Sequence, residues 1–138
     1  MAATPNNFVS PQNVLTATAV CTAAKTDLSN TANAVRLIAA GTNPNGTFLK
    51  RVVVVPRATA GATQAVLYRS YDSGTTLFPF ASIQLPAYTA NTSTAVTIGD
   101  FGFSEDQPGR QRAGEELWCS VGVALAAGFV FSAEYEAF

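Results

Sequence analysis

A two-residue alternation of side-chain type constrains this fold more than any other feature of the chain. In residues 14–23, Val and Thr alternate with Leu, Ala and Cys, so one side is rich in Thr and the other is apolar. The same period marks residues 116–125 and 129–138. Their apolar sides carry Leu117, Cys119, Val121, Val123 and Leu125, and Phe129, Phe131, Ala133 and Tyr135. Successive side chains of a β-strand point to opposite faces, so the alternation predicts three strands that each bury one face.

A run of four valines, residues 52–55, also favours β-structure, because β-branched side chains lose freedom in a helix. An unbroken apolar run is typical of a strand covered on both faces, so residues 47–55 are predicted to form such a strand, ended by Pro56. Residues 34–39 and 94–98 are predicted as two further short strands. Residues 99–114, which are rich in Gly, are predicted to be a loop.

A hairpin is predicted from residues 64–71 and 77–85, which flank Asp72-Ser73-Gly74. Pro79 lies in the second arm and has no amide hydrogen to donate to a ladder. The second arm is therefore predicted to be an edge strand or to contain a bulge.

These segments amount to about eight short strands separated by turn-forming residues, and none shows a capped 3.6-residue stripe. The pattern predicts an all-β fold of antiparallel strands, as a sandwich, jelly roll or barrel. We assign residues 13–138 to a single β-sandwich or jelly-roll-like domain. Residues 1–12, which are polar and contain Pro5 and Pro11, are predicted to be an extended N-terminal arm.

The composition is unusually poor in charge for a chain of 138 residues, with 48% hydrophobic and 12% charged residues. Two interpretations stay open: a neutral surface coated with Thr, Ser and Asn, or a surface largely covered by neighbouring subunits. The net charge of −1 and the absence of a basic run argue against nucleic-acid binding. No apolar stretch is long enough to span a bilayer, and residues 1–10 lack a leader pattern. We therefore expect the protein to stay in the cytoplasm or to be released by lysis.

The residues that usually carry catalysis are scarce. The chain has no histidine, which removes histidine-based nucleophilic machinery and histidine-bound zinc. Its two cysteines, Cys21 and Cys119, are expected to be buried thiols that form a disulfide only if their strands meet. Asp100-Phe-Gly matches the magnesium-binding tripeptide of protein kinases, but none of the other kinase motifs is present.

Acidic residues offer the remaining routes to chemistry. Glu134 and Glu136 share a strand face, as paired catalytic carboxylates can. A solvated or interface-facing strand edge is the favoured explanation, because nothing nearby in the sequence supplies the sugar-stacking cleft that such catalysis requires. Asp27, Asp72, Asp100 and Asp106 do not follow the spacing of a calcium loop, although structural calcium at a subunit junction stays open. Two matches to the N-glycosylation pattern, at Asn45 and Asn91, are interpreted as polar loop residues. No enzyme activity, catalytic residue, metal or cofactor is predicted.

Aromatic residues are the more informative group. Trp118 is out of phase with Leu117 and Cys119, so it is predicted to point away from the main core. It then lies either on a second buried face or in a contact with another subunit, where Trp, Tyr and Arg are favoured. We select a set of candidate interface residues in which core and interface roles stay open. They are Phe8, Tyr68, Tyr71, Phe78, Phe80 and Trp118.

Several short segments resemble a loose group of small structural proteins encoded by tailed bacteriophages. The segments are Thr22–Thr26, Ala34–Ile38, Pro56–Thr59, Leu67–Thr75, Asp100–Asp106, Ala113–Leu117, Val121–Leu125 and Gly128–Ser132. The resemblance is one of style and order over residues 14–138, and none of these segments has a known chemical role. It implies a virion component made in the host cytoplasm, with capsid decoration as the first choice.

The expected partners are therefore the major capsid protein or other virion proteins, together with further copies of this chain, a trimer being favoured. Low charge and apolar flanks suit a symmetric assembly, and an extended arm can order on a capsid surface. The alternatives are a tail, baseplate or fibre component, and a carbohydrate-binding sandwich whose Trp118 and tyrosines stack on sugars.

Overall fold

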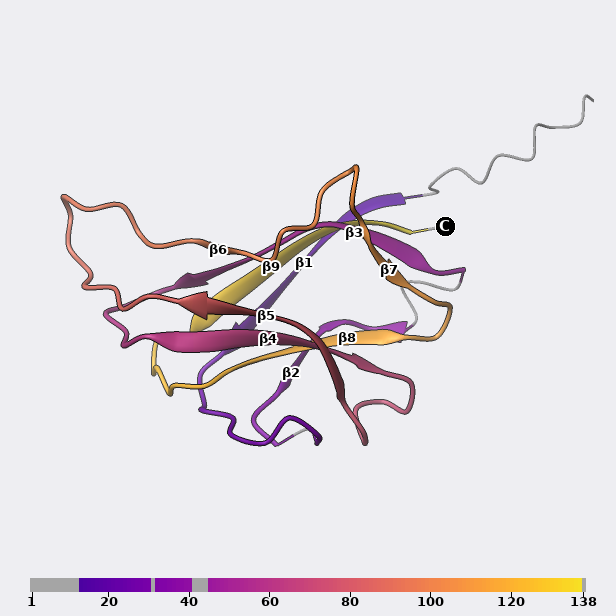
Figure 1. The fold of residues 1–138 in the computed structure, drawn as a ribbon, viewed down its shortest axis with the longest axis horizontal. Coiled ribbons are helices and arrows are strands. Elements are labelled where there is room, and N and C mark those ends of the chain that lie inside the picture. The colour runs from indigo at the N-terminus through magenta and orange to yellow at the C-terminus, as the bar shows by residue number, and fades with distance from the viewer. Residues whose placement is uncertain (1–12, 31, 41–44, 138) are drawn as a thin grey trace, which may run out of the picture.

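The computed structural model describes residues 13–30, 32–40 and 45–137 and contains two antiparallel sheets packed face to face (Figure 1). The first sheet has the order β1 (Asn13–Cys21), β9 (Phe129–Ala137), β3 (Thr47–Pro56), β6 (Gly99–Asp100), and β7 (Gly109–Gln111) also pairs with β3. The second sheet has the order β2 (Val35–Ile38), β8 (Glu116–Val121), β4 (Thr63–Ser70), β5 (Phe78–Leu85). The prediction of an all-β sandwich is confirmed. The arm predicted for residues 1–12 lies outside the described residues.

The strands pair as a nested series: β1 with β9, β2 with β8, β3 with β6 and β7, and β4 with β5. Every one of these pairs is antiparallel. The chain therefore resembles one long hairpin wrapped over itself into two sheets, which is a jelly-roll-like arrangement. The β4–β5 pair lies at the closed end of this hairpin, where Asp72-Ser73-Gly74 was predicted to reverse the chain.

The core fills the space between the sheets, and the two-residue alternation places it correctly. In β9, Phe129 and Phe131 are almost completely buried, whereas Val130 and Ser132 between them are only half-buried. β1 pairs with β9 over its whole length without a register shift. An unbroken register keeps Ala19 and Cys21 of β1 on the core side with Phe129 and Phe131 of β9, because a slip of one residue would turn each of them outward.

A second, smaller apolar cluster lies on the outer face of the second sheet. Val66, Tyr68 and Leu77 are buried there, with Ala34 and Trp118 packed against them. The connection between β1 and β2 covers this cluster and runs along the bottom of Figure 1. Its backbone is fixed to the sheet by two hydrogen bonds, from the Lys25 amide to the Val121 carbonyl (2.9 Å) and from the Leu77 amide to the Ser29 carbonyl (3.0 Å).

Lys25 fastens this covering loop from within. The side chain is only 3% exposed, and its Nζ donates to the Ala32 carbonyl (2.9 Å) and to Asn30 Oδ1 (3.3 Å). Burial lowers the pKa of Lys25, and the nearby Asp27 carboxylate partly offsets that shift. The aliphatic part of the side chain thus fills space under the loop while the ammonium group satisfies loop oxygens.

The prediction made from Pro79, an edge strand or a bulge, is confirmed, and the strand has both features. β5 is the edge strand of the second sheet, and its register against β4 shifts between Leu67 and Tyr68. Tyr68 pairs with Pro79 while Leu67 pairs with Ala81, so Phe80 is the extra residue of a bulge. The bulge interrupts the strict alternation of this strand just after the hairpin turn.

Three predicted boundaries are wrong. Residues 94–98 form no strand, and the predicted loop at 99–114 contains β6 and β7. The glycines explain this error, because a Cβ at Gly99 would lie 2.5 Å from a Leu85 methyl carbon, and one at Gly109 would lie 2.9 Å from the Phe103 ring. Glycine at these two positions permits close packing, whereas the Gly-rich sequence pattern had indicated a loop.

The third wrong boundary is at the end of the segment predicted for residues 116–125, since β8 ends at Val121. The valine run also differs from its prediction. Val52 and Val54 are completely buried, but Val53 and Val55 are only half-buried. The reason is that the outer face of the first sheet has no covering loop among the described residues comparable to that of the second sheet.

Candidate interaction surface

Three of the six candidate interface residues meet in the β4–β5 hairpin. Tyr71 and Phe78 are 46% and 51% exposed, and their ring centroids lie 6.1 Å apart. Phe80 is half-buried, with its ring centroid 6.4 Å from that of Phe103. Neighbouring large aromatic side chains that are exposed in one chain often mark a surface that a partner covers, so Tyr71 and Phe78 are the clearest candidate contact.

The hairpin turn fixes the positions of these two rings. Ser70 Oγ accepts a hydrogen bond from the Gly74 amide (2.7 Å) and donates to Asp72 Oδ1 (3.0 Å), which also accepts from the Thr76 amide (3.0 Å). The bond from the Thr76 amide is the main cause that lowers the pKa of Asp72. Ser73 and Gly74 both adopt positive φ, the conformation that reverses the chain. The turn is thus held by its own side chains before any partner binds.

Two arginines stack on the aromatic rings. The Arg112 guanidinium carbon lies 4.4 Å from the centroid of Tyr71, and that of Arg69 lies 4.4 Å from the centroid of Phe80. Such cation–π contacts hold a long side chain in one position. We call Arg69, Tyr71, Phe78, Phe80 and Arg112 the arginine–aromatic patch.

A buried carboxylate supports the patch from below. Glu115 is 1% exposed, its Oε1 lies 3.0 Å from Arg69 Nε, and its Oε2 accepts a hydrogen bond from the Arg112 amide (2.8 Å). The Arg69–Glu115 contact is an ion pair by distance but is not aligned as a hydrogen bond at these two atoms. The same carboxylate therefore holds the side chain of Arg69 and the backbone of Arg112, while the Arg112 guanidinium is placed on the Tyr71 ring.

The other three candidates lie outside the arginine–aromatic patch. Tyr68 is completely buried within the chain, and its hydroxyl lies 2.6 Å from Ser120 Oγ, so of the two roles left open for it the structure supports the core role. Trp118 is half-buried on the covered face of the second sheet and donates from Nε1 to Glu116 Oε1 (3.1 Å). Glu116 also pairs with Arg36 (3.1 Å). Phe8 lies outside the described residues.

Sequence reasoning missed the outer face of the first sheet as a candidate surface. Thr16, Thr18 and Glu134 are exposed there, and the side chain of Arg51 lies 3.9 Å from Asp100 in a loose ion pair. Val14 at the start of β1 is 79% exposed. The Thr-rich side of residues 14–23 was the sequence signal for this surface. The sequence does not show that the face stays open, because that depends on which of the two sheets carries a covering loop.

The two long edge strands lack charge. β1, at one edge of the first sheet, and β5, at one edge of the second, contain no charged residue. β1 is also free of proline and of bulges against β9. Natural sheets usually protect their edges with charges, prolines or bulges, so β1 is an edge without that protection.

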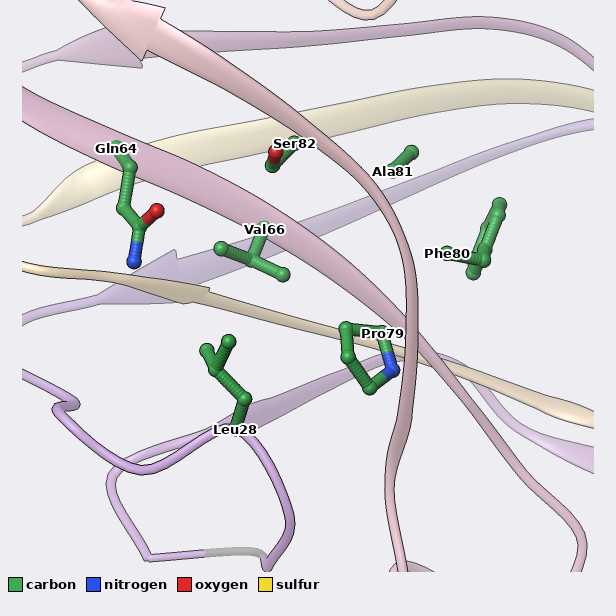
Figure 2. A pocket seen from close by; sticks show the side chains of 7 residues that line it. All are labelled: Leu28, Gln64, Val66, Pro79, Phe80, Ala81 and Ser82. Atoms are coloured by element: carbon green, nitrogen blue, oxygen red, sulfur yellow. The ribbon is translucent and has the colours of Figure 1, made fainter.

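A shallow pocket beside β5 offers little chemistry. It measures about 240 Å³ and is lined by Leu28 of the covering loop and by residues of β4 and β5, of which Gln64 and Ser82 supply the polar groups (Figure 2). This is smaller than most small-molecule sites, and no titratable side chain lines it.

The acidic candidates have local structural roles. Glu136 pairs with Lys50 at 3.5 Å, and Asp100 Oδ1 accepts a hydrogen bond from the Gly102 amide (2.8 Å) in a local turn. Among the described residues, no three His, Cys, Asp or Glu side chains come close enough together to hold a metal ion. The same part of the chain contains no helix long and apolar enough to cross a bilayer.

No family model matches this chain, and neither a curated protein nor a solved structure matches it.

Proposed function

We propose that this protein is a non-enzymatic structural component of a virion, and specifically a capsid decoration or cement protein that binds the phage head as a homo-oligomer. The observation that carries the proposal is the arginine–aromatic patch, a preformed and exposed cluster on a chain that is otherwise poor in charge. Tyr, Trp and Arg are the residue types that dominate binding energy at protein interfaces. The partner that fits is a capsid protein surface with apolar side chains around a carboxylate.

Charge supports this choice of partner. In the described part of the chain, the patch and its surroundings contain three arginines, Arg69, Arg110 and Arg112, and two carboxylates, so the balance is positive. Glu115 is buried, and Asp72 is exposed in the hairpin turn. A carboxylate on the partner gains a charge-assisted hydrogen bond with an arginine, while the rings of Tyr71 and Phe78 supply the apolar contact. The rigid turn lowers the entropy lost when such a contact forms.

The jelly-roll-like fold is compatible with the proposal and does not decide it. Jelly rolls occur in viral capsid domains and also in lectin domains, and fold alone does not specify function. The neutral edge of β1 supports the homo-oligomeric part, since an unprotected strand edge is a natural contact for a second copy. A trimer is the assembly we favour, and a protein that stays monomeric at micromolar concentration in native mass spectrometry contradicts this part.

Binding to particles tests the proposal directly. Phage particles assembled without this chain are incubated with the purified protein, and the bound copies are counted by quantitative mass spectrometry. A copy number that matches the capsid lattice is expected, whereas a handful of copies identifies a tail, baseplate or fibre component. Absence from the native particle contradicts a virion role.

Variants identify the contact. Phe78→Ala and Tyr71→Ala are each expected to weaken binding about tenfold or more if the patch is the binding centre. Ile98→Ala is the matched control, because Ile98 is 56% exposed and lies outside the patch. All three variants are expected to keep the melting temperature of the parent protein within a few degrees, so that lost binding is not lost folding.

Carbohydrate binding is the second candidate, favoured by the two exposed aromatic rings of Tyr71 and Phe78. The weaker point is that Arg112 already covers one face of Tyr71, and the two rings are tilted by 47° instead of forming a flat platform. A glycan array on which specific binding is abolished by Tyr71→Ala supports this function in place of capsid binding.

A further inference from the structure

The two cysteines of the chain meet in the middle of the core. Cys21 ends β1 in the first sheet, and Cys119 lies within β8 in the second sheet. Their Sγ atoms are 3.6 Å apart, and both residues are 0% exposed. Both are free thiols. No other pair of nucleophilic side chains among the described residues is placed so close together across the two sheets.

The remaining distance to a covalent bond is small. A disulfide has an S–S distance of about 2.05 Å, so the two sulfur atoms need to approach by about 1.5 Å. Side-chain rotation can supply much of this movement, because the two sulfur atoms already face each other. The contacts that rotation gives up are long, since Cys21 Sγ lies 3.6 Å from the Cys119 carbonyl and Cys119 Sγ lies 3.5 Å from the Val35 carbonyl. The surrounding core is apolar, with Cys21 and Cys119 both belonging to the main cluster.

We propose that Cys21 and Cys119 are a latent disulfide site, which closes when the protein leaves a reducing compartment and then joins the two sheets covalently. The oxidant is a low-molecular-weight disulfide. A thiolate of one cysteine attacks it, forms a mixed disulfide and releases one small thiol. The second cysteine attacks the protein sulfur of that mixed disulfide, forms the Sγ–Sγ bond and releases the second small thiol. Two protein thiols are oxidised, and one small disulfide is reduced to two thiols.

The site is protected from rapid reaction in the folded protein. Burial raises the pKa of Cys119 well above its ordinary value, so little thiolate is present at neutral pH. The oxidant therefore reaches the sulfurs through opening of β1, an edge strand that pairs with β9 on one side. The same protection works in reverse, because a buried disulfide is shielded from reductants once it has formed.

The crosslink has a large effect on stability because it closes a long loop. The two residues are 98 positions apart, and closing a loop of that length removes much conformational freedom from the unfolded chain. We expect the melting temperature to rise by roughly 10 °C on oxidation. This inference goes beyond the proposed function and does not depend on it, since both cysteines lie within one chain.

The experiment compares two preparations of the full chain, one refolded with oxidised and reduced glutathione and one kept in a phosphine reductant. The expected oxidised product is lighter by about 2 Da, is monomeric on a non-reducing gel, yields a linked peptide pair containing Cys21 and Cys119, and melts at the higher temperature. Cys21→Ala and Cys119→Ala are the controls, and in both the melting temperature is expected to be independent of oxidation.

Four results overturn the inference. They are two thiols that stay reduced after oxidative refolding, a stable glutathione adduct as the end product, a crosslink between two chains, and an internal crosslink that leaves the melting temperature unchanged or lower. Folding of the alanine variants is checked by circular dichroism. If either variant does not fold, Cys21→Val or Cys119→Val replaces it, because a Val side chain fills similar space without a thiol.

Discussion

The buried pair of hydroxyls formed by Tyr68 and Ser120 gives the sharpest test of the second cluster. The two oxygens are 2.6 Å apart, Tyr68 is 0% exposed and Ser120 is 1% exposed. Tyr68→Phe removes one hydroxyl and leaves the Ser120 hydroxyl buried without this partner. Ser120→Ala does the reverse. The double variant removes both groups and leaves an apolar contact.

The effects of the two single substitutions on the free energy of unfolding should not be additive in the double variant. A buried hydrogen bond contributes about 1 kcal/mol net, and a buried polar group left without a partner costs about 1–3 kcal/mol. We therefore expect each single variant to lower the free energy of unfolding by about 1–2 kcal/mol, and the double variant to lower it by about the same amount, not by the sum. The resulting coupling energy is about 1 kcal/mol. Tyr68→Ala, which also leaves a cavity, should cost about 3–5 kcal/mol.

The assay is urea unfolding, followed by circular dichroism and by the fluorescence of Trp118, the only tryptophan of the chain, which packs against Tyr68 in the same cluster. A coupling energy of zero would refute the hydrogen bond. If Tyr68→Ala left stability unchanged but abolished assembly, the assignment of Tyr68 to the core would be wrong, and its alternative role in an interface would be supported.

Three further predictions concern the core, a tight turn and the hairpin. Val121→Asp should prevent folding, because Val121 is 1% exposed and an unpaired carboxylate cannot be accommodated there. The control is Val14→Asp, at a 79% exposed position, which should change the free energy of unfolding by less than about 0.5 kcal/mol. Soluble expression of the two variants is the measurement. Gly128→Ala should cost more in urea unfolding than Gly114→Ala, since both glycines have positive φ but only at Gly128 would a Cβ meet another atom, 2.3 Å from a Val20 methyl carbon. The pKa of Asp72, measured by NMR titration, should lie below its ordinary value of 3.8. The contribution of the Asp72 carboxylate to the stability of the turn is therefore fully present above pH 3.8 and is lost as the pH falls through the lowered pKa. A measured pKa at or above 3.8 contradicts this prediction.

The sequence predicted the fold well where one physical signal dominated. The two-residue period located β1 and β9 almost to the residue, because each buries one face and leaves the other open. Pro79 predicted an edge strand or a bulge, because a missing amide hydrogen is tolerated in few other places, and β5 has both features. In both cases the local residue chemistry and the three-dimensional setting agree.

The prediction failed where the environment of a residue is formed by residues that are distant in the sequence. Gly99 and Gly109 are needed for close packing against Leu85 and Phe103, which no local pattern reveals. Tyr68 and Tyr71 are three residues apart on the same hairpin, yet one is fully buried and the other is 46% exposed. The difference arises because Tyr68 packs in the second cluster, against which Ala34 of the β1–β2 connection also packs, whereas Tyr71 follows the end of β4 in the hairpin turn. No period in the sequence indicates that this polar connection covers a sheet.

The asymmetry of the two outer faces bears on why the chain is poor in charge. The second sheet hides its outer apolar residues under its own loop, so it needs few solubilising groups of its own. The first sheet has no such cover among the described residues, and its β1 edge is uncharged. A neutral Thr coat keeps this face soluble but does not discourage pairing of the β1 edge with another strand, because repulsion between charged edges is the usual safeguard. Placing a lysine at Thr16 or Thr18 should therefore reduce self-association while leaving the melting temperature of the monomer nearly unchanged.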